Sequence, residues 1–183
     1  MKKKTLVYVL ICSIVAVIVV NSALPRTTIS EASWAHYYKS VDELYTRADL
    51  VILCEVSSSI SYYEKASIFG EQDISTNYTM KILEVYKGTP ENKNIIVHQT
   101  GGKLGNKVHY ISDDPLIDHE KMILFLRRYH YSQYAILGGP QGRYIIRNDN
   151  VYSIGEVNSK ASGTTDHLST QGLTIDLFIN NFT

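Results

Sequence analysis

Two neighbouring stretches near the middle of the chain predict a pair of long strands. Leu50–Val56 is a run of β-branched and apolar residues that is too short for a typical helix. In Tyr78–Leu83, side chains alternate between two sides, which is the period-two pattern of a strand with one buried face. Because the two stretches are close in sequence, we expect an antiparallel pair joined by a mobile polar loop over residues 64–76.

Further short apolar runs, each bounded by turn residues, predict the remaining strands. They are Asn94–Gln99, Val108–Ser112, Glu120–Arg128, Tyr134–Leu137, Arg143–Arg147 and Val151–Ile154. The last two flank Asn148, Asp149 and Asn150, which tolerate positive φ, so they should form a hairpin with a short loop.

Capping residues predict one short helix at each end of this β-rich region. Ser40 and Glu43 match a capping box, which predicts a helix that ends near Arg47. Thr174 is the expected N-cap of a closing helix over residues 175–182.

The N-terminus has the pattern of a targeting segment. Lys2–Lys4 is positively charged, Leu6–Val20 is apolar apart from Ser13, and Asn21–Ala23 offers small residues for a signal peptidase. The apolar run is short for a bilayer-spanning helix, so a cleaved signal peptide is favoured over a retained anchor. In either case residues 25–183 should be extracytoplasmic, either secreted or anchored to the outer face of the plasma membrane.

The length suits one folded domain that needs no disulfide. We expect a signal peptide or anchor over residues 1–24, a tether over 25–39 and a single domain over 40–183. Because Cys12 lies in the targeting segment, Cys54 is the single thiol of that domain. Its position within a strand predicts a buried structural residue rather than a nucleophile.

Charge and motifs argue against several kinds of function. Lys plus Arg equals Asp plus Glu at 18 each, and without Lys2–Lys4 there are 15 basic against 18 acidic residues, so no nucleic-acid partner is expected. The sequence contains no GxSxG elbow, phosphate-binding loop or dinucleotide fingerprint, and we expect no cofactor. The acidic segment 113–120 matches no metal-binding spacing and is interpreted as a solvated turn. His98 and His109, on neighbouring candidate strands, would leave a metal site incomplete.

Tyrosine is the unusual feature of the composition, with 14 Tyr against 4 Phe and 1 Trp. Tyrosines near the expected strand ends, accompanied by arginines, have the composition of binding hot spots, because both residue types offer large contact areas. Plain packing at the rim of a sheet is the other interpretation, and both stay open. The candidate contact surface, near loop 64–76, the 129–131 turn and the 138–143 corner, comprises Tyr62, Tyr63, Arg128, Tyr129, Tyr131, Gln141 and Arg143.

Four segments carry a resemblance to known proteins: Ala48–Val56, Tyr78–Gly88, Glu120–Leu126 and Gly138–Gly142. They resemble a family of uncharacterised exported proteins of Gram-positive bacteria and, more remotely, the netrin-like domain of tissue inhibitors of metalloproteinases. The resemblance implies a five-stranded OB-like barrel with additions. Those inhibitors use an N-terminal cysteine and several disulfides, which this chain lacks, so their inhibitory chemistry is not carried over.

The sequence thus predicts a mainly β fold, an OB-like or netrin-like antiparallel β-barrel with a short helix before the first strand and a short C-terminal helix. The leading functional hypothesis is a non-enzymatic exported module that binds an envelope or extracellular protein. A cell-wall carbohydrate binder is the alternative, and a hydrolase whose site is assembled from distant residues is a second alternative. Membrane contact is expected only through the N-terminal segment, if that segment is not cleaved.

Export gives the first testable prediction. N-terminal sequencing of the extracytoplasmic protein should begin near Ala23 or Leu24, because the small residues there come directly after the apolar run. A full-length product confined to the cytoplasm would contradict the predicted localisation.

Overall fold

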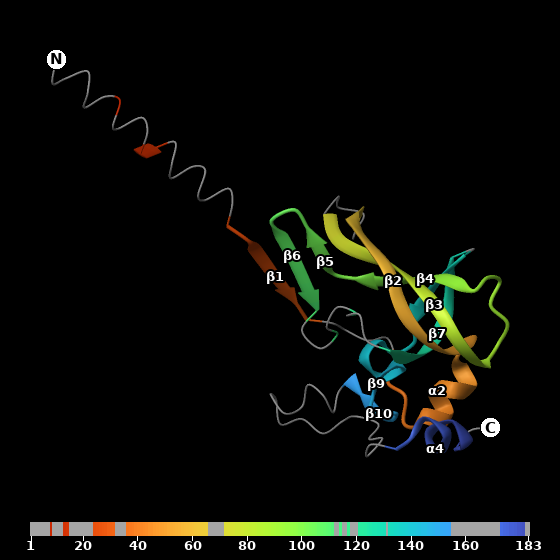
Figure 1. Cartoon of the computed structure of the whole chain (residues 1–183). Coiled ribbons are helices and arrows are strands. Elements are labelled where there is room, and N and C mark those ends of the chain that lie inside the picture. The colour runs from red at the N-terminus through yellow and green to blue at the C-terminus, as the bar shows by residue number, and fades with distance from the viewer. Residues whose placement is uncertain are drawn as a thin grey trace.

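The computed structural model is mainly β, and the residues that it describes include two short helices (Figure 1). It describes residues 8, 13–14, 24–31, 36–65, 72–111, 114, 117, 121–130, 132–154 and 173–181. The strands are β1 (Arg26–Ser30), β2 (Leu50–Lys65), β3 (Gln72–Lys87), β4 (Asn94–Thr100), β5 (Gly102–Leu104), β6 (Lys107–Ile111), β7 (Met122–His130), β8 (Gln133–Ile136), β9 (Arg143–Arg147) and β10 (Asn150–Ser153). The helices are α2 (Val41–Arg47) and α4 (Ile175–Asn180), and η1 (Gly139–Gly142) is a short 3-10 turn.

The larger sheet closes on itself into a ring. Its strand order is β10-β9-β7-β2-β3-β4-β8, and an additional pairing joins β8 back to β7. Five strands, β7-β2-β3-β4-β8, therefore form the ring, in which only the β4–β8 pair is parallel. A separate three-stranded sheet has the order β1-β6-β5.

The first part of β2 supplies both cores of the molecule. Leu50, Ile52 and Cys54 join a cluster to which all five ring strands contribute, so this cluster fills the interior of the ring. Val51 and Leu53 join a second cluster on the outer side, together with residues of α2, α4, β9 and β10. This continuous buried run, predicted as one strand, thus has a core on each face.

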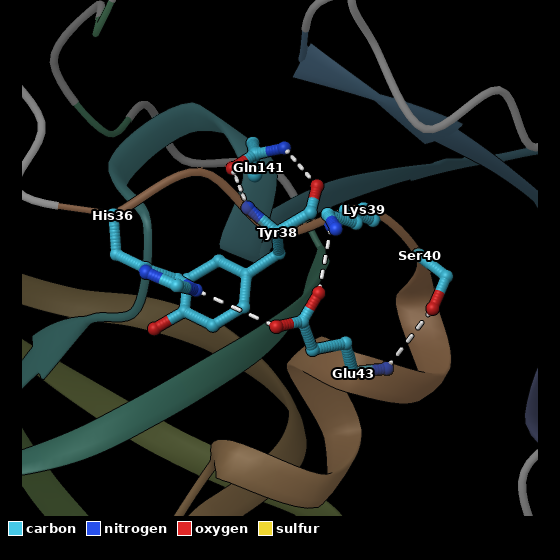
Figure 2. A network of polar contacts seen from close by, with 6 residues as sticks. All are labelled: His36, Tyr38, Lys39, Ser40, Glu43 and Gln141. Carbon is cyan, nitrogen blue, oxygen red and sulfur yellow. Dashed lines mark hydrogen bonds and ion pairs between the residues drawn. The ribbon is translucent and has the colours of Figure 1, made fainter.

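Local sequence signals explain the elements that cover the outer side. The Ser40 hydroxyl accepts a hydrogen bond from the Glu43 amide and caps α2, as predicted (Figure 2). The Glu43 carboxylate, however, accepts a hydrogen bond from the Lys39 amide rather than from the Ser40 amide. The predicted hairpin of β9 and β10 is confirmed, with Asn148 and Asp149 at φ of 51° and 61°. The N-cap of α4 is Thr174, as predicted.

The segment before α2 belongs to the folded part of the chain. Figure 2 shows the Gln141 side chain beside the backbone of Tyr38. Its Oε1 accepts a hydrogen bond from the Tyr38 amide and its Nε2 donates one to the Tyr38 carbonyl, each 2.9 Å long. Tyr38 itself is buried in the outer core. Residues Arg26–Ser30 pair in parallel with β6. The expected tether over 25–39 is therefore wrong for these residues, because hydrogen bonds to the distant β6 and η1 hold a stretch that has no periodicity of its own.

Two further expectations are corrected. The expected polar loop over 64–76 is shorter in the structure, since β2 continues to Lys65 and β3 begins at Gln72, and the connection between them lies outside the described residues. The stretch after β4, which is not among the predicted strands, contains strand β5. Gly102 permits this because a Cβ there would collide with the Thr76 hydroxyl, so β5 packs closely on β3.

A buried ion pair lies on the interior side of the sheet. Arg143, the cross-strand partner of Leu124, is 2% exposed, and its Nη2 is 3.3 Å from Oδ1 of Asp114, which is also buried. The Gln99 side chain donates a hydrogen bond to the Asp114 carbonyl and accepts one from the Ile117 amide, which holds these two residues against β4. The interpretation of segment 113–120 as a solvated turn is therefore wrong for Asp114. The other candidate ligands of that segment lie outside the described residues.

The N-terminal segment is described only at Tyr8, Ser13 and Ile14, so its predicted role stays a prediction. Among the residues that the structure describes, no helix is long and apolar enough to span a bilayer.

The ion pair predicts a large stability effect at Arg143. Arg143→Ala should lower the free energy of unfolding by about 3–5 kcal/mol, because the buried Asp114 carboxylate loses its cationic partner. Arg147→Ala, at an exposed position of the same strand, is the matched control and should change stability by less than about 0.5 kcal/mol. Urea denaturation measures both variants, and equal stabilities would contradict the buried pair.

Cys54 should behave as a core residue. Its side chain is fully buried, Sγ lies 3.6 Å from the Met122 carbonyl, and burial raises the pKa of the thiol above its usual range. Cys54→Ala should cost about 1 kcal/mol of stability, and Cys54→Lys should prevent folding. Rapid reaction of the native thiol with a polar labelling reagent would show that this burial is wrong.

Candidate functional site

A row of side chains crosses the outer face of the ring from strand to strand. Ile60 of β2 pairs with Asn77 of β3, which pairs with His98 of β4. His98 pairs with Ala135 of β8, and Ala135 pairs with Arg127 of β7. On β3, β4, β8 and β7, the residue next to the member of the row belongs to the interior core; these neighbours are Tyr78, Val97, Tyr134 and Leu126. Because side chains alternate along a strand, the row faces outward on all five strands.

A register shift brings the far part of β2 into this row. Before the shift between Val56 and Ser58, even-numbered residues such as Cys54 point into the ring. Beyond it, the even-numbered Ile60 and Tyr62 point outward. One extra residue in a strand reverses the faces of all later residues, which is how this β2 segment adds to the outer surface.

Polar contacts converge on His98. Its Nδ1 lies 3.2 Å from the Tyr62 hydroxyl and 3.2 Å from Oδ1 of Asn77, and its Nε2 lies 3.5 Å from Oε2 of Glu64. We call Tyr62, Glu64, Asn77, His98 and Tyr129 the His98 cluster. Its members come from β2, β3, β4 and β7, so closure of the ring is what assembles it.

Tyr129 covers His98. The two rings are stacked, with centroids 5.0 Å apart and planes within 6°. The register of β7 against β8 shifts between Arg128 and His130, so Tyr129 is the extra residue of a bulge, a feature that re-aims a side chain. Tyr129 is 45% exposed, while His98 beneath it is 9% exposed. The outcome is a flat aromatic ring supported from below and accessible from above.

Burial sets the protonation states of the cluster. It lowers the pKa of His98, and His130 acts in the same direction, while the Glu64 carboxylate opposes them. Burial also raises the pKa of the Tyr62 phenol, with smaller contributions from Glu64 and Tyr129. At neutral pH the cluster therefore offers a neutral His98 imidazole and a neutral Tyr62 phenol, which suits hydrogen bonding and stacking rather than nucleophilic attack.

Two of the seven residues of the predicted contact surface meet in this cluster, namely Tyr62 and Tyr129. The Tyr63 side chain is exposed, and the Lys107 ammonium group of β6 lies over its ring, on the other side of β2. Arg128 is exposed, bound to Glu91 at 2.9 Å and packed against the Tyr134 ring. Tyr131 lies outside the described residues.

Gln141 and Arg143 are buried and cannot form part of a contact surface in this conformation. Their side chains are used inside the protein, Gln141 on the Tyr38 backbone and Arg143 on Asp114. The expected 138–143 corner is therefore a structural feature, and the prediction of a surface there is wrong.

Sequence reasoning missed Glu64, Asn77 and Ile60 and treated His98 only as a possible metal ligand. The structure gives the two histidines separate partners, since His109 contacts Ser30 at 2.9 Å and Asp73 at 3.6 Å. Within the described part of the chain, no three His, Cys, Asp or Glu side chains are placed to hold a metal. A helpful signal would have been period-two placement of polar residues on strands, but the bulge in β2 conceals it.

Comparison with known proteins adds no relative: no protein-family model and no curated protein matches this chain. A functional assignment therefore rests on the geometry of the outer face.

Proposed function

We propose that this chain is a non-enzymatic, exported binding module that contacts its partner through the outer face of the ring. The observation that carries the proposal is the Tyr129 ring, which is stacked on His98 of the row and is 45% exposed. A preformed aromatic surface supported by fixed hydrogen bonds loses little conformational freedom on binding. The proposed location is outside the plasma membrane, as expected from the N-terminal pattern.

The strand order supports an OB-like or netrin-like architecture as part of this proposal. Numbered along the ring, β2, β3 and β4 are successive neighbours, and β8 then lies between β4 and β7. This is a Greek-key order of five strands, as in OB folds, which bind ligands across a sheet face and the adjoining loops. The His98 cluster would lie on such a face.

An envelope or extracellular protein is the partner that we favour. Ile60 is 70% exposed and Arg127 is exposed, and they lie at the two ends of the row whose middle residue, His98, carries Tyr129. Aromatic and arginine side chains near an apolar contact are typical of protein-binding hot spots. The excess of acidic over basic residues in the exported part disfavours polyanionic partners.

A cell-wall carbohydrate is the second candidate, because one observation favours it. The Glu64 carboxylate and the Asn77 side chain contact the His98 ring on which Tyr129 is stacked, so hydrogen-bonding groups lie close to an aromatic platform. Sites that take small polar ligands combine such a surface with a few placed polar groups.

The absence of catalysis stays part of the proposal, and two observations support it. Tyr62 contacts a histidine that faces a carboxylate, which is the arrangement of an activated nucleophile. However, burial raises the pKa of Tyr62, so the phenol is not activated. Burial raises the pKa of Cys54 as well.

The test compares capture of isolated Gram-positive envelopes by variants of the full chain. Tyr129→Ala should weaken binding at least about thirtyfold, which corresponds to the cost of about 2 kcal/mol for truncating a hot spot, while the melting temperature changes little. Tyr63→Ala, at an exposed position on the other side of β2, is the matched control and should bind as the unmodified protein does.

Treating the envelopes with protease before the assay separates the two partner classes. Loss of capture after this treatment supports a protein partner, and capture that persists and is competed by soluble wall glycan supports a carbohydrate. If Tyr129→Ala binds normally but unfolds early, Tyr129 is a packing residue and the proposed surface is wrong.

A further inference from the structure

A serine, a histidine and a carboxylate from separate strands meet beside the three-stranded sheet. His109 of β6 is buried, and its Nε2 lies 2.9 Å from the hydroxyl oxygen of Ser30 in β1. Its Nδ1, at the other side of the ring, lies 3.6 Å from Oδ1 of Asp73 in β3. Strands β1 and β6 lie side by side in Figure 1. We call Ser30, Asp73 and His109 the Ser30 triad, which shares no member with the His98 cluster.

Strand pairing brings the serine to the histidine. His109 is the cross-strand partner of Thr28, and Ser30 follows Thr28 by two residues. Because side chains two apart on a strand lie on the same face, Ser30 and His109 share one face of the small sheet. Asp73 reaches the same histidine from the beginning of β3, in the larger sheet. The Ser30 triad therefore depends on contacts between distant segments, and no local sequence motif indicates it.

The Asp73 carboxylate favours one tautomer of the neutral His109 ring. A hydrogen on Nδ1 turns its positive end toward the carboxylate, whereas a bare Nδ1 would turn a lone pair toward it. At 3.6 Å this attraction is electrostatic rather than a short hydrogen bond. With the hydrogen on Nδ1, Nε2 is an acceptor, so Ser30 donates its hydroxyl hydrogen to His109. This is the direction of hydrogen bonding that a general base requires.

These contacts have the order of an activated nucleophile. A hydroxyl lies within hydrogen-bond reach of a histidine base, and a carboxylate orients that base from its other nitrogen. Ser30 is only half-buried, so a reagent can reach its hydroxyl while the imidazole stays covered. The arguments against nucleophilic Tyr62 and Cys54 do not apply to Ser30, because an adjacent base rather than a lowered pKa activates a serine.

We propose that Ser30 is a nucleophile that accepts an acyl group from an activated carboxylic ester, with His109 as the general base and Asp73 as the residue that positions it. The inference goes beyond the proposed function, since it concerns a different cluster of residues. It covers the formation of a single acyl-serine on each chain. That event is stoichiometric, so it is compatible with a non-enzymatic module.

The step balances without an oxidant or a reductant. The Ser30 oxygen attacks the carbonyl carbon of the ester, and its proton passes to Nε2 of His109. The bond from that carbon to the alcohol oxygen then breaks, and the departing alcohol takes the proton from Nε2. The products are an ester of Ser30 and a free alcohol, and the imidazole is neutral again.

The first test labels the full chain in detergent micelles with a fluorophosphonate, a reagent that reacts with activated serines and releases fluoride. Peptide mapping by mass spectrometry then compares the labelling rates of single serines. Ser30 should react at least about 100-fold faster than Ser59, an exposed serine of β2, because a positioned base typically contributes about that factor or more. If the contacts only tie β1 to the sheet, Ser30 reacts no faster than Ser59, and the proposal is overturned.

Variants at the histidine test the base. His109→Gln should lower the labelling rate of Ser30 by about 100-fold or more. His36→Gln, which changes an exposed histidine that faces the Glu43 carboxylate, is the matched control and should leave the rate unchanged. Labelling of Ser30 that is equally fast in folded His109→Gln would contradict the general base.

Variants at Asp73 test its positioning role and do not disturb a buried side chain, since Asp73 is 47% exposed. Asp73→Asn keeps the size of the side chain and removes its charge, so it should lower the labelling rate by a smaller factor than His109→Gln. Asp73→Glu restores the carboxylate and should recover much of the rate, which a merely structural contact would not produce. Equal rates in Asp73→Asn and the unmodified protein would contradict the assigned role of Asp73.

Reaction with p-nitrophenyl acetate tests acyl transfer itself. We expect rapid release of about one equivalent of nitrophenol, with the acetyl group on Ser30, and Ser30→Ala should lack this release. Continued release that Ser30→Ala abolishes would support the nucleophile but reveal turnover, so the non-enzymatic part of the proposed function would fail. Equal release by Ser30→Ala and the unmodified protein would overturn the nucleophile and leave the outer-face contact surface unaffected.

Discussion

Leu50–Cys54 is the stretch on which the rest of the structure depends. All five side chains are buried, and they alternate between the interior of the ring and the outer core. The same residues pair with β3 on one side and with β7 on the other, so they join the two halves of the ring. A polar side chain at any of them would leave one core incomplete, because both faces of this strand are covered.

The division of β2 into two parts explains where a contact surface can exist. Its first part is covered on the outer side by α2, α4 and the β9–β10 hairpin, which Figure 1 shows gathered at one end of the molecule. Its second part begins after the register shift near Val56 and is not covered by these elements. The row from Ile60 to Arg127 begins on this second part. Structural and contact roles are thus separated along one strand by a single bulge.

Much of the fold could be predicted from the sequence, because local signals govern it. The helix caps depend on the nearby residues Ser40 and Thr174, and the hairpin depends on the turn residues Asn148 and Asp149. The alternation of side chains in Tyr78–Leu83 directly indicates which face of that strand is buried. Strand β1 was missed because its pairing with β6 depends on residues about eighty positions away.

The candidate site was only partly predictable for a related reason. Tyr62 and Tyr129 were recognised by residue type, which is independent of orientation. Gln141 and Arg143 were misassigned because nothing in the local sequence reveals that Tyr38 and Asp114 lie beside them. His98 gained its role from three other strands, and the bulge in β2 reversed the face that period-two reasoning would assign to Tyr62.

The central claim is that the uncovered outer face of the ring is the contact surface. Hydroxyl-radical footprinting of the full chain, with and without isolated envelopes at neutral pH, tests it at the level of single side chains. The account predicts that Ile60 and Tyr129 become protected, while Leu83 on β3 and Leu177 on α4, which are also exposed, react as before. Protection of Leu83 or Leu177 with unchanged labelling of Ile60 and Tyr129 would contradict it.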